Sequence, residues 1–380
     1  MPAGEQRVTP LELFFDLVFV FAITQVTGLM SADPTWEGIG RGLLVLAALW
    51  WAWAAYAWLT NTLEPEEGIV RVAMFAAMAA MLLVGLAVPE AFGDDGVLFG
   101  LAYFAARAIH LELYAIAGRG DPGLREAVLR LVPTATLGPA LIVAAGFLDG
   151  AAQVALWASA LAIDYAGPLR GRGRGWLVSP AHFAERHGLI VIVALGESVV
   201  ALGIGAAGLT LDAGLVVAAV LGTAVIAAVW WAYFDVFAVY AQRHLSELRG
   251  DARARFARDY FSYLHLPLIA GIVLFALGLE KTLEHVGDPL ATVPAVALCG
   301  GLGLYFLAHV GFRLRIARSI GRGRPAAAIA LLALVPAALE TPALVALALV
   351  TLVCCSLILY DVMHYREERR RIRLARHEAH

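Results

Sequence analysis

The sequence is poor in charge and in lysine, and both shortages narrow the class of protein. Charged residues make up 16% of the 380 residues, whereas a soluble globular domain has about a quarter of its residues charged. Lysine occurs once, at Lys281, so arginine carries almost all of the positive charge. Hydrophobic residues reach 61% and the mean hydropathy is +0.77. This composition excludes a soluble globular domain and indicates a protein that crosses a membrane many times.

Long polar segments, abundant cysteines and catalytic sequence motifs are also missing. No predicted loop much exceeds about 18 residues, which leaves no room for a soluble catalytic or nucleotide-binding domain. The only cysteines, Cys299, Cys354 and Cys355, lie in predicted spans, where apolar packing is favoured over disulfide formation. The motifs H-E-x-x-H, C-x-x-C and G-x-S-x-G do not occur. We therefore expect any chemistry to lie within the membrane, without a cofactor and without a nucleic-acid partner.

Apolar stretches of about 20 residues, the length needed to cross the hydrocarbon core, fill the chain. They cover about 11–31, 39–60, 69–89, 97–117, 126–148, 151–167, 183–207, 213–240, 259–280, 292–312, 325–339 and 341–363. The alternating polarity of β-barrel strands is absent, so the backbone must satisfy its hydrogen bonds as helices. We predict an all-α polytopic membrane helix bundle with about 12 transmembrane helices.

From residue 119 onward, arginines occur in every second gap between these stretches, and this alternation predicts the orientation. They lie at 119–130, 170–174, 243–258, 313–324 and 366–376, whereas the opposite gaps are acidic. By the positive-inside rule, both termini are cytoplasmic. We expect a multi-pass protein of the plasma (inner) membrane, with membrane lipid as its surroundings.

Short sequence similarities between the two halves suggest an internal duplication. The matched pairs are Val8 to Pro10 with Val178 to Pro180, Trp50 to Trp53 with Trp230 to Tyr233, and Tyr103 to Ala106 with Tyr305 to Ala308. Such a duplication predicts two parallel six-helix halves, 1–170 and 171–364, followed by a basic cytoplasmic tail, 365–380. The alternative is chance similarity among apolar helices.

Ionisable side chains inside the predicted spans are the candidate functional residues, because a charge in the middle of a spanning helix costs about 2.5–3.5 kcal/mol on insertion scales. Glu12 and Asp16 share a helix face and would repel each other unless a cation or a proton lies between them. Arg186 is the expected partner, and Glu197 lies about three turns further along the same stripe. We predict a cytoplasmic cavity with Glu197 at its closed end. The full candidate set is Asp16, Glu12, Arg186, Glu197, Glu185, His110, Arg107 and Asp235.

Two segments carry a resemblance to a known family. The segments Thr9 to Ile23 (TPLELFFDLVFVFAI) and His182 to Ser198 (HFAERHGLIVIVALGES) resemble the bacterial low temperature requirement protein A family, and the similarity runs over nearly the whole chain. The resemblance implies a multi-spanning membrane protein named for a cold-growth phenotype, without a biochemical activity to carry over. The family's marked positions correspond to Glu12, Asp16, Glu185, Arg186, Gly196 and Glu197.

Three functions fit these residues. In the leading hypothesis the protein is a secondary transporter, and Asp16, Arg186 and Glu197 bind a small polar or ionic solute or carry a coupling proton. A carboxylate deep in apolar surroundings can exchange a proton on each cycle, which favours Glu197 for that role. The second is a membrane-embedded enzyme for a lipid or isoprenoid, with acids, bases or metal ligands at Glu185, His187, His110 and Asp235. The third is a structural or stress-related protein whose polar residues only fix helix packing.

Overall fold

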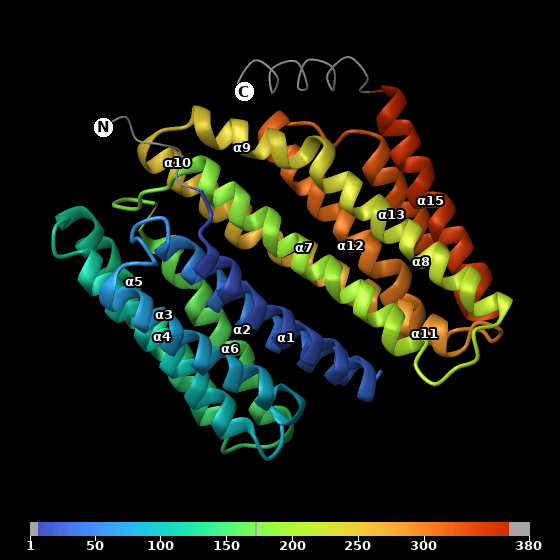
Figure 1. The fold of residues 1–380 in the computed structure, drawn as a ribbon, viewed down its shortest axis with the longest axis horizontal. Helices are drawn as coiled ribbons and strands as arrows, with labels where there is room; N and C mark the ends of the chain where they lie inside the picture. The colour runs from blue at the N-terminus through green and yellow to red at the C-terminus, as the bar shows by residue number, and fades with distance from the viewer. Residues whose placement is uncertain (1–6, 172, 365–380) are drawn as a thin grey trace. The chain divides into compact units, whose positions relative to one another are not determined.

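The computed structural model describes residues 7–171 and 173–364, and this part of the chain is helical without any strand. A long helical stretch occupies each of the twelve predicted positions (Figure 1). They are α1 (Pro10–Ala32), α2 (Trp36–Leu59), α3 (Gly68–Ala87) with η1 (Val88–Glu90), α4 (Gly96–Ala117), α5 (Pro122–Ala145), α6 (Gly150–Arg170), α7 (Pro180–Gly205), α8 (Ala213–Ala232) with η2 (Tyr233–Phe237) and α9 (Ala238–Glu247), α10 (Gly250–Phe256) with η3 (Ala257–Tyr263) and α11 (His265–Glu284), α12 (Thr292–Ala317), α13 (Gly323–Ala333) with α14 (Val335–Glu340), and α15 (Ala343–His364).

The predicted polytopic helix bundle is confirmed. Among the described residues, 11 of these stretches are long and apolar enough to cross a membrane. The remaining stretch, α6, has 21 residues but a lower hydropathy, because it carries Gln153 and Asp164. Both of these side chains are 1% exposed, so α6 directs its polar groups into the protein. The predicted basic tail at 365–380 lies outside the described residues.

The chain forms two compact units. The first comprises Met1–Glu197 and Gln242–Leu266, and the second comprises Ser198–Ala241 and Pro267–His380. The predicted division into six-helix halves after residue 170 stays a prediction.

Small residues set the helix packing in the first unit. Helix α1 packs on α2 and α3, and α3, α4, α5 and α6 follow one another as neighbours (Figure 1). A Cβ atom at Gly100 of α4 would lie 2.6 Å from the Cα atom of Val143 on α5. This contact allows the backbones of α4 and α5 to approach closely, as is typical of membrane helix interfaces. Helix α2 contacts both α4 and α6 and contributes the fully buried side chains of Trp53 and Tyr56.

The start of α1 is fixed by its own sequence. Thr9 and Glu12 form a capping box, in which the Thr9 hydroxyl accepts from the Glu12 backbone N–H and the Glu12 carboxylate accepts from the Thr9 N–H. Pro10 occupies the first turn, where its missing N–H costs nothing. Because Glu12 is also fully buried, this cap places one carboxylate at a defined depth inside the first unit.

The second unit is built on similar contacts. Helix α8 packs on α15, α12 packs on α13, and α13 packs on α15. Helices α11 and α12 approach closely at Gly271 and Gly301, where a Cβ atom on either residue would lie within 2.8 Å of the other helix's backbone. The three cysteines are free thiols, as the sequence predicts; Cys299 and Cys354 are buried and Cys355 is exposed.

Candidate functional site

Four ionisable side chains from α1 and α7 meet in the first unit, and we call them the buried charged cluster: Glu12, Asp16, His182 and Arg186. Arg186 donates from Nη2 to Oδ1 of Asp16 at 2.9 Å, and its Nη1 lies 3.7 Å from Oε1 of Glu12. Nε2 of His182 lies 3.0 Å from the same Glu12 oxygen. None of the four residues is more than 3% exposed. The structure therefore brings together Glu12, Asp16 and Arg186, as their spacing and charge predict.

Trp53 of α2 holds this cluster from a third helix. Its indole Nε1 donates to Oδ1 of Asp16 at 2.9 Å, and its ring lies 5.7 Å from the Arg186 guanidinium carbon, within cation–π range. Several polar atoms remain without a hydrogen bond to any described residue: Oδ2 of Asp16, Nε and Nη1 of Arg186, and Nδ1 of His182. The cluster thus retains donors and an acceptor that no described residue satisfies.

The formal charges of the cluster do not balance without an additional proton. Glu12 and Asp16 contribute two negative charges when ionised, and Arg186 contributes one positive charge. An unbalanced charge in a site without solvent is expensive, so the neutral state is strongly preferred. That state needs one proton on His182 or on one of the two carboxylates. With His182 neutral and the other three groups ionised, the cluster carries a net charge of −1.

Glu197 lies on the same helix pair but apart from the cluster. It is 1% exposed and accepts a hydrogen bond of 2.6 Å from Oγ1 of Thr24 on α1. The eleven residues from Arg186 to Glu197 correspond to about 16 Å along α7 at 1.5 Å per residue. His187 follows Arg186 directly and is also buried, and the buried α7 side chains from there to Glu197, Ile190, Val191, Ala194 and Leu195, are apolar. The α1–α7 interface thus has two polar positions separated by an apolar segment.

The remaining candidates lie elsewhere. Glu185 is exposed on α7, where one carboxylate oxygen accepts from the Val8 backbone N–H at 3.4 Å. Asp235 is half-buried in η2 and belongs to the second unit. His187 is fully buried, and its ring lies 4.9 Å from the rings of both Trp53 and Phe261. In the part of the chain that the structure describes, no three His, Cys, Asp or Glu side chains could hold a metal ion together.

Arg107 and Asp164 form a second buried ion pair, on α4 and α6. Nη2 of Arg107 donates to Oδ1 of Asp164 at 3.0 Å, and both residues are 1% exposed. Sequence reasoning singled out Arg107 but missed Asp164, which lies in the least apolar predicted span. The signal that could have found it is the buried arginine itself, because such a charge requires a carboxylate on a neighbouring helix.

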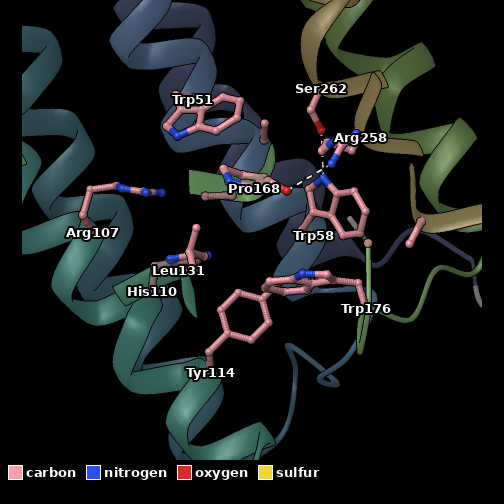
Figure 2. A pocket seen from close by; sticks show the side chains of 14 residues that line it. Trp51, Trp58, Arg107, His110, Tyr114, Leu131, Pro168, Trp176, Arg258 and Ser262 are labelled. Atoms are coloured by element: carbon pink, nitrogen blue, oxygen red, sulfur yellow. Dashed lines mark hydrogen bonds between the residues drawn. The ribbon is translucent and has the colours of Figure 1, made fainter. Parts of the chain in front are cut away.

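A recess with three tryptophans and Tyr114 in its lining lies beside this pair, and we call it the aromatic recess (Figure 2). It encloses roughly 570 Å³ of empty space, part of it open to the surroundings. Trp51 and Trp58 of α2 and Trp176 of the α6–α7 loop form one part of the lining, and Arg107, His110 and Tyr114 of α4 form another. Arg258 and Ser262 of η3 also line it, and the Ser262 hydroxyl accepts from Trp58 Nε1 at 2.8 Å.

Apolar helices of membrane-spanning length, with ion pairs buried among them, define a multi-pass helical membrane protein. The model of the family described as bacterial low temperature requirement A protein (LtrA) matches residues 7–359, and the chain belongs to this family. The family membership expected from the two sequence segments is therefore confirmed. The chain is also 30% identical over 324 residues to an uncharacterized protein of Rhizobium meliloti. The aligned region covers 81% of this chain and 77% of that relative. No solved structure matches the chain.

Proposed function

We propose that this protein is a proton-coupled secondary transporter of a small polar or ionic solute. The observation that carries the proposal is the charge of the buried charged cluster. Two carboxylates face a single arginine, so the cluster is neutral only while it holds one proton. A solute that competes for Arg186 or for the carboxylates changes the preferred number of protons. Binding of the solute and of the proton are therefore linked through the same four side chains.

Glu197 and Thr24 supply the second position that coupling requires. Glu197 is buried within α7, where an ionised carboxylate is costly. Its Thr24 hydrogen bond lies on the same α1–α7 interface as the cluster. We assign Glu197 the role of the carboxylate that accepts and releases the coupling proton. The apolar residues between the two positions prevent a continuous proton leak.

The proposal includes an orientation. The arginine-rich loops face the cytoplasm of a bacterial cell, both termini lie on that side, and the plasma membrane surrounds the bundle. The buried charged cluster then lies in the cytoplasmic half of the membrane, because α1 and α7 begin on that side. Glu197 lies deeper, toward the bilayer centre.

The test is a pH recording in proteoliposomes that contain a lumenal pH-sensitive dye. A panel of inorganic ions, divalent metals and amino acids is added outside, one member at a time. We expect at least one member to change the lumenal pH with wild-type protein. We expect Glu197→Gln to abolish that change, because glutamine keeps the shape and cannot carry a proton. Thr24→Val, which removes the hydroxyl donor to Glu197, should slow the change.

Glu67→Gln is the matched control, since Glu67 is exposed before α3 and makes no side-chain cap hydrogen bond. It should give the wild-type pH change. Equal pH changes for wild type and Glu197→Gln, with both proteins monodisperse by size-exclusion chromatography, would remove Glu197 from the mechanism. A panel that leaves the lumenal pH unchanged for wild type would argue against proton coupling to any of its members.

A further inference from the structure

We propose that the aromatic recess is a binding site for a flat aromatic carboxylate. The carboxylate would lie against Arg107, His110 and Tyr114, and the ring would lie against Trp58 and Trp176 (Figure 2). This site is separate from the α1–α7 residues to which the transport function is assigned. The proposal rests on the hydrogen-bonding capacity that the recess leaves unused and on the chemistry of its lining.

The α4 side of the recess has more donors than acceptors. Arg107, His110 and Tyr114 lie at i, i+3 and i+7 on α4, so they share one helix face, and each is 1% exposed. After the Asp164 pair is formed, Nε and Nη1 of Arg107 and the Tyr114 hydroxyl have no hydrogen-bond partner among the described residues. The His110 ring nitrogens also lack a hydrogen bond of ordinary geometry there, although the Ala55 backbone lies beside the ring.

Unused donors at this depth favour a ligand that brings acceptor oxygens. A lipid acyl chain would fill the recess but would leave the buried Arg107 and Tyr114 donors unsatisfied, which is costly. A carboxylate supplies two acceptor oxygens, and guanidinium groups bind carboxylates with parallel N–H donors. An amine ligand would instead meet the positive charge of Arg107.

The opposite lining favours a flat ring. Trp176 contacts Tyr114 with ring centroids 5.3 Å apart and Trp58 with centroids 5.8 Å apart, both edge to face. Such arrangements provide rigid apolar surfaces that pack well against a further aromatic ring. Arg258 also lines the recess, but its guanidinium already donates to the Pro168 carbonyl and pairs with Asp259. We therefore do not assign it to the carboxylate of the ligand.

The test compares three naphthalene compounds of similar shape. The purified full chain in lipid nanodiscs is equilibrated with 2-naphthoate, 2-methylnaphthalene or 2-naphthylmethylamine, and binding above that of empty nanodiscs is measured. We expect saturable binding of 2-naphthoate, at least about tenfold tighter than that of the other two, because only the acid satisfies the Arg107 and Tyr114 donors.

Two variants link this binding to the recess. Tyr114→Phe removes only a hydroxyl without a partner, so the fold should be kept while 2-naphthoate binds about tenfold more weakly. Trp176→Leu removes a ring from the lining and should weaken binding similarly. Trp231→Leu, which changes an exposed tryptophan of the second unit, should leave the affinity unchanged. The proposal is overturned if 2-naphthoate does not bind, if all three compounds bind equally, or if both recess variants bind the acid like wild type.

Discussion

Arg186 and Asp16 bind each other across two helices that lie 170 positions apart in the chain. The Nη2–Oδ1 distance is 2.9 Å, and the two side chains are only 1% and 5% exposed. Each charge therefore depends on the other for compensation in a part of the protein that water does not reach. In such a pair, removal of one partner costs more than the pair contributes, because the remaining charge is left uncompensated.

The first prediction follows from this pair. Arg186→Gln should destabilise the protein by about 3–5 kcal/mol, the range for breaking one side of a buried ion pair. The double variant Asp16→Asn with Arg186→Gln should recover part of that loss, since neither charge is then unpaired. The measurement is thermal unfolding in detergent, followed by fluorescence and by the monodisperse fraction on size-exclusion chromatography.

Arg119→Gln provides the control, because Arg119 is exposed after α4 and should tolerate the same substitution. If the single and double variants at Asp16 and Arg186 lose stability additively, the two side chains are not coupled and the cluster is not the electrostatic unit described above.

The second prediction concerns the Arg107–Asp164 pair. Asp164→Leu alone should be strongly destabilising, because it leaves the Arg107 guanidinium buried without its carboxylate. Arg107→Leu with Asp164→Leu should be close to wild type, since apolar replacement of a whole buried pair is often neutral or stabilising. Thermal unfolding under the conditions above gives the comparison. A double variant less stable than Asp164→Leu would contradict a purely electrostatic role for the pair.

The sequence was sufficient to predict the architecture and part of the site. Each of the twelve apolar stretches in the sequence correctly predicts a helical stretch in the structure, because a membrane-spanning backbone has few alternatives to the helix. The Asp16–Arg186 contact was predictable from charge, since two carboxylates four residues apart need a cation and one arginine lies at a matching depth. In both cases strong physical constraints act on residues that can be read directly from the sequence.

The residues that escaped prediction are those whose role depends on a neutral or unexpected partner. Thr24 and Trp53 hold Glu197 and Asp16, yet a threonine and a tryptophan in apolar helices do not differ visibly from packing residues. Asp164 lies in the span with the weakest apolar signal. The aromatic recess depends on η3 and on the loop with Trp176, and no periodicity in the sequence indicates how these segments are placed.

The third prediction concerns orientation. Single cysteines introduced at the exposed residues Arg119 and Asp94 should differ in labelling by a membrane-impermeant maleimide. In intact spheroplasts we expect Asp94→Cys to react and Arg119→Cys to react only after the membrane is permeabilised, because arginine-rich loops face the cytoplasm. The native cysteines give the background, since they lie in helices within the bundle or facing lipid. Labelling of Arg119→Cys in intact spheroplasts would reverse the proposed orientation.

The fourth prediction concerns the contact between α11 and α12. A Cβ atom at Gly301 would lie 2.7 Å from the Gly271 carbonyl oxygen and 2.7 Å from the Phe275 backbone nitrogen. Neither backbone atom can move aside without separating the helices, so Gly301→Ala should destabilise the protein by about 1–3 kcal/mol through overpacking. Gly300→Ala is the neighbouring control, because its nearest contact would be a Val296 side-chain carbon at 3.4 Å. Thermal unfolding of the two variants should separate them clearly, and equal stabilities would mean that α11 and α12 are not packed backbone to backbone at this point.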